Sequence, residues 1–170
     1  MAFNQKIQDA FNAQMNREFY SSNLYLAMAA HCDSEGFKGL ANWLAIQAEE
    51  ERAHAMKFYS FIISRGGRVK MGQHPQPPDS WKNPLNIFEE VLKHEQLVTS
   101  HINDLVDLAQ AERDHAASSF LQFFVDEQVE EEDSAGEIVD RLKIGGDHGT
   151  SLFMIDSELG QRIQTTTNQA

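Results

Sequence analysis

The sequence is short of cysteine, of basic residues and of long apolar runs. It has a single cysteine, Cys32, among 170 residues, which excludes an intrachain disulfide and a CxxC redox or metal pair. No stretch approaches the roughly 18 consecutive apolar residues of a membrane-spanning helix, and the first ten residues lack the features of a secretory signal. We therefore expect a soluble, cytoplasmic protein.

Basic residues are outnumbered, with 14 lysines and arginines against 26 aspartates and glutamates and a formal net charge of -12. This charge repels phosphate backbones and anionic lipid headgroups. We therefore expect no nucleic acid and no membrane among the partners, and we expect small cations instead. The length fits one compact domain, which we assign to residues 1–170.

Proline is also scarce, and all four prolines fall within residues 75–84. Because proline interrupts helices, its absence elsewhere predicts long helices on both sides of one irregular connection. The expected helices, whose ends are marked by glycines and capping residues, cover residues 5–33, 37–65, 84–112 and 115–144. Such helices are about 43 Å long, and the stretch from Gly66 to Asn83 is long enough to cross a bundle of that length.

A short apolar segment follows Gly149 and predicts a fifth helix at about residues 150–160. It is too apolar for a free tail, so we expect it to pack on a neighbouring chain. The predicted fold class is therefore all-α. It is a four-helix bundle with a long crossover between the second and third helices and a short fifth C-terminal helix.

The inward face of each long helix, followed at spacings of three and four residues, is interrupted near its middle by polar side chains. On the third helix this face runs through Leu92 and Thr99. The interrupting residues are Glu18 on the first helix, Glu51 and His54 on the second, Glu95 on the third, and Gln128 and Glu131 on the fourth. No lysine or arginine lies on these faces, and each unpaired buried ion costs several kcal/mol. A bound cation would supply the missing charge.

A pair of divalent metal ions fits this pattern. The second and fourth helices each present two ligands three residues apart, which lie one above the other on a helix face. Oxygen-rich ligation with a single imidazole favours iron, with manganese as the alternative, over a structural zinc site.

Three stretches of the sequence resemble the bacterial non-haem ferritins, a ferritin-like diiron family. They are Arg17–Tyr20, Glu49–His54 and Glu127–Glu132, and Glu95 lies between them at the same spacing as in that family. The resemblance implies iron storage in a hollow homo-oligomeric cage of 24 subunits. It also implies a ferroxidase that oxidises Fe(II) with dioxygen and stores Fe(III) as a ferric oxyhydroxide mineral.

The resemblance also implies how the residues are shared between the metal ions. The first iron would be held by Glu18, Glu51 and His54. The second would be held by Glu51, Glu95, Gln128 and Glu131, so that Glu51 bridges the two ions. Bacterioferritins, which bind haem, have histidine where this chain has Glu131 and methionine where it has Arg52. Both differences argue against haem.

Two further features stand next to the predicted ligands. Glu50, Glu127 and Glu130 each precede a ligand by one residue and are rotated by about 100° from it. In the resembling family these positions form a third iron site. Tyr25 follows Glu18 by seven residues and should lie near the metal ions, where its phenol can hydrogen-bond a ligand or give up an electron.

Two other functions stay open from the sequence. One is a diiron or dimanganese oxygenase, peroxidase or catalase that acts on another substrate, which requires a pocket leading to the metal ions. The other is a storage shell with an idle centre, which an oxygen-consumption trace would distinguish from a ferroxidase. His94 and His101 lie off the inward face, and we expect them to be surface or contact residues.

Overall fold

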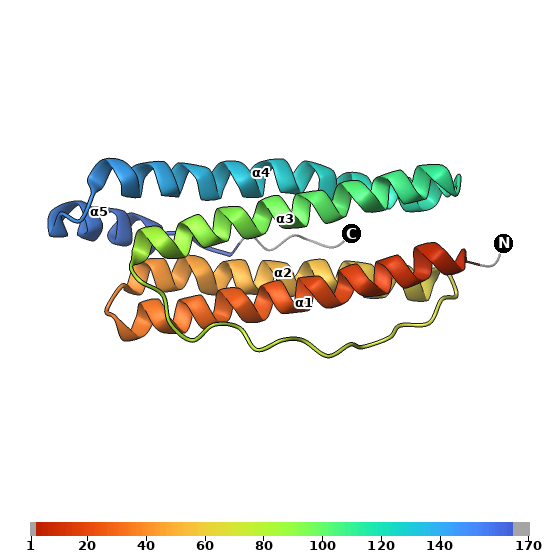
Figure 1. Cartoon of the computed structure of the whole chain (residues 1–170), viewed down its shortest axis with the longest axis horizontal. Helices are drawn as coiled ribbons and strands as arrows, with labels where there is room; N and C mark the ends of the chain where they lie inside the picture. Colours follow the sequence, from red (N-terminus) through yellow and green to blue (C-terminus); the bar gives the residue numbers. More distant parts are fainter. Residues whose placement is uncertain (1–2, 165–170) are drawn as a thin grey trace.

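The structure is a computed structural model that describes residues 3–164. Its five helices are α1 (Gln5–Ser34), α2 (Lys38–Ser64), α3 (Pro84–Ala111), α4 (His115–Gly145) and α5 (Gly149–Leu159). No strand occurs within residues 3–164. The predicted all-α class, with four long helices and a short fifth one, is confirmed (Figure 1). Each helix begins and ends within one residue of its expected position.

Side chains next to the helix ends explain where the helices begin. The Asn4 side chain accepts a hydrogen bond from the Lys6 amide, 2.9 Å away, and Asp114 accepts one from the Ala117 amide at 3.0 Å. Pro84 is the first residue of α3, where its missing N–H costs nothing. Beyond the end of α2, Gly66 has a φ of +71°, which glycine adopts without strain.

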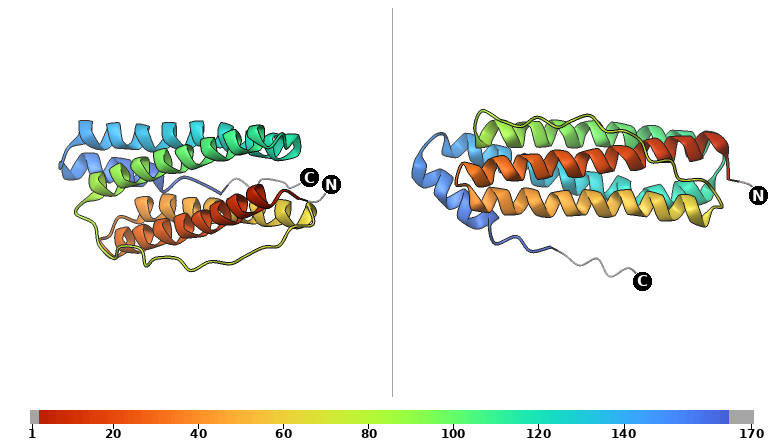
Figure 2. Two further views of the ribbon diagram at one scale, coloured as in Figure 1. Left: turned by 45° about the vertical axis from the view of Figure 1, so that its right-hand side comes forward. Right: turned by 90° about the horizontal axis from the view of Figure 1, so that it is seen from below.

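The long helices form two hairpins, α1 with α2 and α3 with α4, which lie one above the other in Figure 1. A crossover formed by residues 65–83 connects the end of α2 to the start of α3. It runs along the outside of the bundle, next to α1 in Figure 1, and crosses α1 in the right-hand view of Figure 2. The expected long crossover is therefore present, and it places the two hairpins so that all four helices share one core.

Side-chain amides of α1 hold the crossover in place. Three amides at intervals of four residues hydrogen-bond its backbone, as a neighbouring strand would. Gln8 accepts from the amide of Arg68 at 2.7 Å, Asn12 from Lys70 at 2.6 Å, and Asn16 from Gly72 at 2.7 Å. These bonds satisfy backbone groups of a segment that has no regular secondary structure of its own.

The apolar core is divided into two clusters. One contains Phe11, Phe58 and Phe124, and the other contains Tyr25, Trp43 and Phe88. In the first cluster the Phe58 and Phe124 ring centroids lie 4.5 Å apart. Buried polar side chains occupy the level between the clusters. Well-packed apolar residues on both sides therefore fix the four helices around a polar layer.

The buried face of α3 differs from the one expected. Val91 and Val98 are buried beside Glu95, whereas Leu92 and Thr99 are only partly buried. Spacings of three and of four residues are equally compatible with one helix face, and packing against α4 selects between them. Thr99 therefore lies at the edge of the core, where its hydroxyl donates to Glu132 at 2.6 Å.

Helix α5 packs on α2 and α4 of its own chain, with Ile155 and Leu159 buried. Helices α2 and α5 cross closely at Gly39, since this residue has no side chain. A Cβ atom added there would lie 1.6 Å from the carbonyl oxygen of Asp156. Phe153 is 73% exposed and Met154 is 65% exposed. The expected contact with a neighbouring chain stays a prediction for these two side chains.

Candidate metal centre

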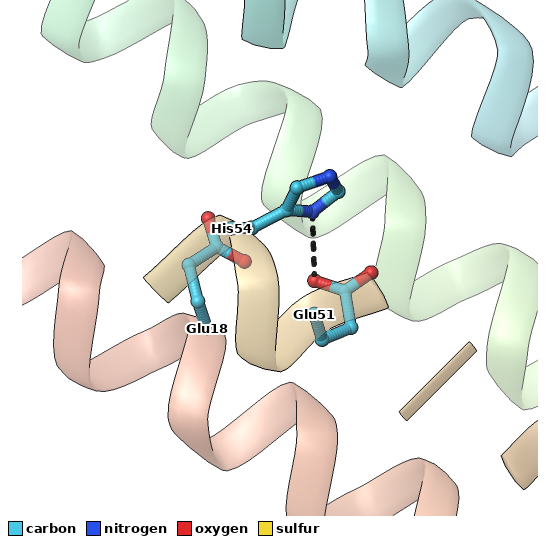
Figure 3. A group of neighbouring side chains, drawn as sticks. All are labelled: Glu18, Glu51 and His54. Atoms are coloured by element: carbon cyan, nitrogen blue, oxygen red, sulfur yellow. Dashed lines mark hydrogen bonds and ion pairs between the residues drawn. The ribbon is translucent and has the colours of Figure 1, made fainter. Parts of the chain in front are cut away.

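Glu18, Glu51 and His54 form a compact group at the polar level. Each offers a ligand atom, and these atoms lie within 4.8 Å of one another. All three side chains are buried. Figure 3 shows the Glu18 side chain extending from α1 toward the His54 ring, and the Glu51 carboxylate joined to that ring by an interaction of 3.4 Å to His54 Nδ1. Glu51 and His54 meet because residues three apart share a helix face.

Glu95 joins three helices at the same level. The Tyr25 hydroxyl of α1 donates a hydrogen bond to Glu95 Oε1. The Gln128 side-chain amide of α4 donates to Glu95 Oε2 at 3.1 Å. Glu95 and Tyr25 are fully buried and Gln128 nearly so. The predicted position of Tyr25 next to a proposed ligand is therefore present in the structure.

Glu131 completes the predicted set from α4. The Gln47 amide nitrogen of α2 donates to Glu131 Oε2 at 2.5 Å. Burial and then the charge of Glu51 raise the pKa of Glu131 to about 8. Burial and then the charge of Glu131 raise the pKa of Glu95 to about 7. The carboxylates of α2, α3 and α4 thus lie near enough to repel one another, as ligands of one site must.

Glu18 shows that this layer lacks positive charge. Burial, and then the charge of Glu51, raise the pKa of Glu18 to about 8. Its Oε1 atom accepts a hydrogen bond from Gln14 at 2.7 Å. Its buried Oε2 atom has no hydrogen-bond partner among residues 3–164. An orphaned carboxylate oxygen beside other buried carboxylates costs several kcal/mol unless a cation binds there.

His54 provides the positive charge nearest to these carboxylates. Burial alone would lower the pKa of His54, but the charge of Glu51 and the contact with the Glu127 carboxylate outweigh it, so the pKa lies well above its usual value. Within the described part of the chain, no lysine or arginine pairs with Glu18, Glu51 or Glu95. One imidazolium does not balance four carboxylates, so the donor set fits divalent cations.

The residues predicted for a third metal site line one cavity between α2 and α4. Glu50, Glu127 and Glu130 surround a space of about 300 Å³ together with His54 and Glu131. Glu127 Oε2 lies 3.9 Å from His54 Nε2, and this neighbour lowers the pKa of Glu127. The three acids therefore share a space next to the centre, and a guanidinium group, that of Arg162, lies among them.

Comparison with known proteins agrees with this geometry. The sequence model of the family named Ferritin-like domain matches residues 8–144 of this chain. The bacterial non-heme ferritin of Bacteroides fragilis is 47% identical over 158 residues, which cover 93% of this chain and 98% of that protein. The chain belongs to the ferritin family. The resemblance to bacterial non-haem ferritins is thereby confirmed.

Further ferritins are similar to this chain along nearly its whole length. The bacterial non-heme ferritin of Staphylococcus saprophyticus is 42% identical and covers 94% of this chain and 95% of that protein. The crystal structure of an open-pore ferritin from Archaeoglobus fulgidus superposes with a TM-score of 0.94 at 46% identity, covering 95% of this chain and 99% of that one. None of the helices in residues 3–164 combines the length and the hydropathy of a membrane span.

Several side chains that contact the predicted ligands were given no functional role in the sequence analysis. Gln14 and Gln47 each precede a glutamate ligand by four residues, and Thr99 follows Glu95 by four. That spacing, which places side chains side by side on a helix, is a signal that could have found them. Arg162 carries no such signal, because it lies beyond α5 and reaches the cavity only through the fold.

His94 lies deeper than expected. Its side chain is partly buried, and its Nε2 atom is 2.8 Å from the Ser21 hydroxyl. The ring meets that of Tyr25 edge to face at 5.7 Å. Burial, with a smaller effect of His101, lowers the pKa of His94 to about 4. His94 therefore supports the Tyr25 ring as a neutral side chain.

Proposed function

We propose that this ferritin stores iron and that it is a ferroxidase, which oxidises Fe(II) with dioxygen at an intrasubunit dinuclear centre. The observation that supports this most strongly is the buried Oε2 atom of Glu18, which has no hydrogen-bond partner within residues 3–164 and lies in a layer of four carboxylates. The names of the relatives, bacterial non-heme ferritins, support the same conclusion. In this proposal residues 1–170 form a single domain, and 24 copies enclose the ferric oxyhydroxide mineral in a cytoplasmic cage.

In the proposed centre Fe(II) is the substrate, and the ligands divide between two ions. Glu18, Glu51 and His54 hold the first ion, and Glu51, Glu95, Gln128 and Glu131 hold the second. Hard oxygen donors with one imidazole suit Fe(II), and manganese is the weaker alternative. Because burial raises the pKa of Glu18 and Glu131 to about 8, Fe(II) binding at neutral pH displaces protons from these side chains. His54 also gives up its proton to bind through a ring nitrogen.

Hydrogen-bond donors around the centre orient its carboxylates before Fe(II) arrives. Gln14 binds one oxygen of Glu18, and Gln47 binds one oxygen of Glu131. Tyr25 binds one oxygen of Glu95. In each case the carboxylate is held in one orientation, and such outer contacts typically contribute 10- to 100-fold to metal affinity. We propose that Tyr25 acts mainly in this way, next to the reacting ions.

The cavity beside the centre favours Fe(II) over an organic substrate. Its lining includes Glu50, Glu127, Glu130 and Glu131, so its charge attracts cations. An oxygenase or peroxidase for organic molecules would instead need a largely apolar pocket. Glu50, Glu127 and Glu130 are proposed as a third metal site that receives iron next to the centre.

The test is Fe(II) oxidation in air by the assembled, metal-free protein. Dioxygen consumption and ferric absorbance should rise rapidly in the native protein, whereas His54→Ala and Glu18→Ala should lose this phase and still assemble. His115→Ala is the matched control, since His115 is exposed at the start of α4. Equal initial rates in the native protein and the His54→Ala variant would remove the proposed centre. Light scattering of the same samples tests the 24-subunit cage.

A further inference from the structure

Residues 160–164, here called the C-terminal segment, follow α5 and run back toward the middle of the bundle (Figure 2). Arg162 of this segment lines the cavity beside the proposed centre. Its Nη2 atom donates to Glu50 Oε2 at 2.5 Å. Its Nη1 atom donates to Gln47 Oε1 at 3.0 Å and to the Trp43 carbonyl oxygen at 3.3 Å. The guanidinium also lies over the Trp43 ring, 4.5 Å from the centroid. Arg162 therefore occupies a socket formed by one face of α2.

The backbone that carries Arg162 is fixed as well. The Asn42 side chain donates to the Arg162 carbonyl oxygen at 3.0 Å. Upstream, Asp156 of α5 accepts a hydrogen bond from the Leu40 amide at 2.9 Å, near the close crossing at Gly39. The start of α2 thus positions α5, and the following turn of α2 positions the segment with Arg162.

Arg162 determines which way the Gln47 amide points. The guanidinium has only donors, so the Gln47 atom that faces it is the carbonyl oxygen. The NH₂ group of Gln47 then faces Glu131 and donates to it at 2.5 Å. A continuous chain of hydrogen bonds therefore leads from the C-terminal segment through Gln47 to a proposed iron ligand.

Arg162 also brings a permanent positive charge into an acidic cavity, because a guanidinium does not lose its proton in proteins. Its partner Glu50 belongs to the proposed third metal site, so a metal ion that binds Glu50 competes with the guanidinium for the charge of this carboxylate. Lys57 lines the same cavity, but its ammonium lies over the Phe123 ring at 4.4 Å from the centroid. Among these cations, Arg162 is the one that directly contacts Glu50.

We propose that Arg162 is a positioning residue that holds Glu131 through Gln47 and competes with metal ions for Glu50. The C-terminal segment thereby weakens metal binding in the cavity and favours the passage of iron through it. This inference rests on the proposed function, since it assigns a regulator to the third site beside the proposed centre. Arg162 lies outside the residues matched by the ferritin-like domain model, 8–144.

The test is a calorimetric titration of the assembled, metal-free protein with Zn²⁺, which binds oxygen and nitrogen ligands without redox chemistry. The native protein should bind two tight zinc ions per subunit at the centre and a weaker one in the cavity. In Arg162→Gln the cavity site should bind about tenfold more tightly, because a charge-assisted hydrogen bond no longer competes. Adding Glu50→Gln to Arg162→Gln should abolish this gain.

Two matched variants separate charge from packing. Arg162→Lys keeps the charge but loses the planar guanidinium that stacks on Trp43, so its cavity affinity should lie between the native value and that of Arg162→Gln. Arg141→Gln is the control for α5, because Arg141 pairs with Glu158 of α5 at 2.6 Å, away from the cavity lining. It should leave zinc binding unchanged. If Arg162→Gln fails to assemble, Asn42→Ala, which releases the carbonyl groups of Gly160 and Arg162 and leaves the guanidinium in place, should raise the cavity affinity by a smaller factor.

The outcomes distinguish the two proposals. If Arg162→Gln binds two tight zinc ions and its cavity affinity equals the native value, the proposed role of Arg162 is overturned. The proposed centre is then unaffected. An equal gain in Arg141→Gln would also overturn it, since the effect would then come from displacing α5. Absence of the two tight sites in the native protein would instead overturn the proposed function.

Discussion

Glu18→Gln should stabilise the metal-free protein at neutral pH. Glu18 is buried, its Oε2 atom has no partner within residues 3–164, and its other oxygen accepts from Gln14. A glutamine of nearly the same shape keeps one amide oxygen as acceptor and removes the need to bury a carboxylate or retain a proton. The usual result of changing a buried polar residue, a loss of stability, should therefore be reversed here.

The magnitude follows from the pKa of Glu18, which burial and then Glu51 raise from 4.5 to about 8. At pH 7 the folded protein holds a proton that the unfolded chain has released. A pKa difference of one between the folded and unfolded states is worth about 1.4 kcal/mol. At pH 7 the raised pKa of Glu18 therefore lowers the free energy of unfolding by on the order of 3 kcal/mol per subunit. Stability from this group is greatest below pH 4.5 and falls as the pH rises to about 8. For a chain of this size the loss corresponds to about 6 to 12 °C in Tm.

The assay is thermal unfolding of chelator-treated protein at pH 5 and pH 7. Glu18→Gln should have a higher Tm than the native protein at pH 7 and nearly the same Tm at pH 5. Glu49→Gln, an exposed neighbour of the ligands on α2, is the control and should change little at either pH. Adding Zn²⁺ should reverse the order, because the native protein keeps the ligand that the variant lacks. A lower Tm of metal-free Glu18→Gln at pH 7 would show that the buried Glu18 carboxyl group does not destabilise the fold.

Three other changes test the surroundings of the centre. Tyr25→Phe removes the hydroxyl that donates to Glu95 and should lower the initial Fe(II) oxidation rate about 10-fold in stopped-flow measurements, with assembly intact. Gly39→Ala places a methyl group 1.6 Å from the Asp156 carbonyl oxygen, so α5 must move away. Calorimetry should show that the free energy of unfolding falls by about 3 kcal/mol. Asn12→Ala removes two hydrogen bonds to the crossover and should cost about 1 to 3 kcal/mol and speed proteolysis between Arg68 and Lys70. An unchanged oxidation rate in Tyr25→Phe would contradict the role of its hydroxyl. An unchanged melting curve in Gly39→Ala would contradict the close crossing of α2 and α5, and unchanged cleavage in Asn12→Ala would contradict its role in holding the crossover.

The fold was largely predictable because its signals are local. Proline confined to one segment, a capping Asp114 and helix-ending glycines fix where helices begin and end. The polar interruption of each inward face was visible for the same reason, since residues such as Glu51 and His54 are brought together by helix periodicity alone. The structure gathers the predicted residues at one level, and their role as iron ligands stays a proposal.

What the sequence did not reveal depends on contacts between distant segments. The amides of Asn12 and Asn16 hold a crossover more than 50 residues away, at separations of 58 and 56 residues. Arg162 reaches Glu50 across 112 residues. The burial of Val98 in place of Thr99 depends on how α3 rotates against α4. None of these follows from residue type or spacing, because each is decided by packing between elements.

The carboxylates and the imidazole at mid-bundle are proposed to bind two ferrous ions. Crystals soaked anaerobically with a ferrous salt, measured at the iron absorption edge, test this most directly. Two anomalous peaks about 3.5 to 4 Å apart are expected, with the Glu51 carboxylate between them. Absence of iron among Glu18, Glu51 and His54, with iron only on the outer surface, would contradict it.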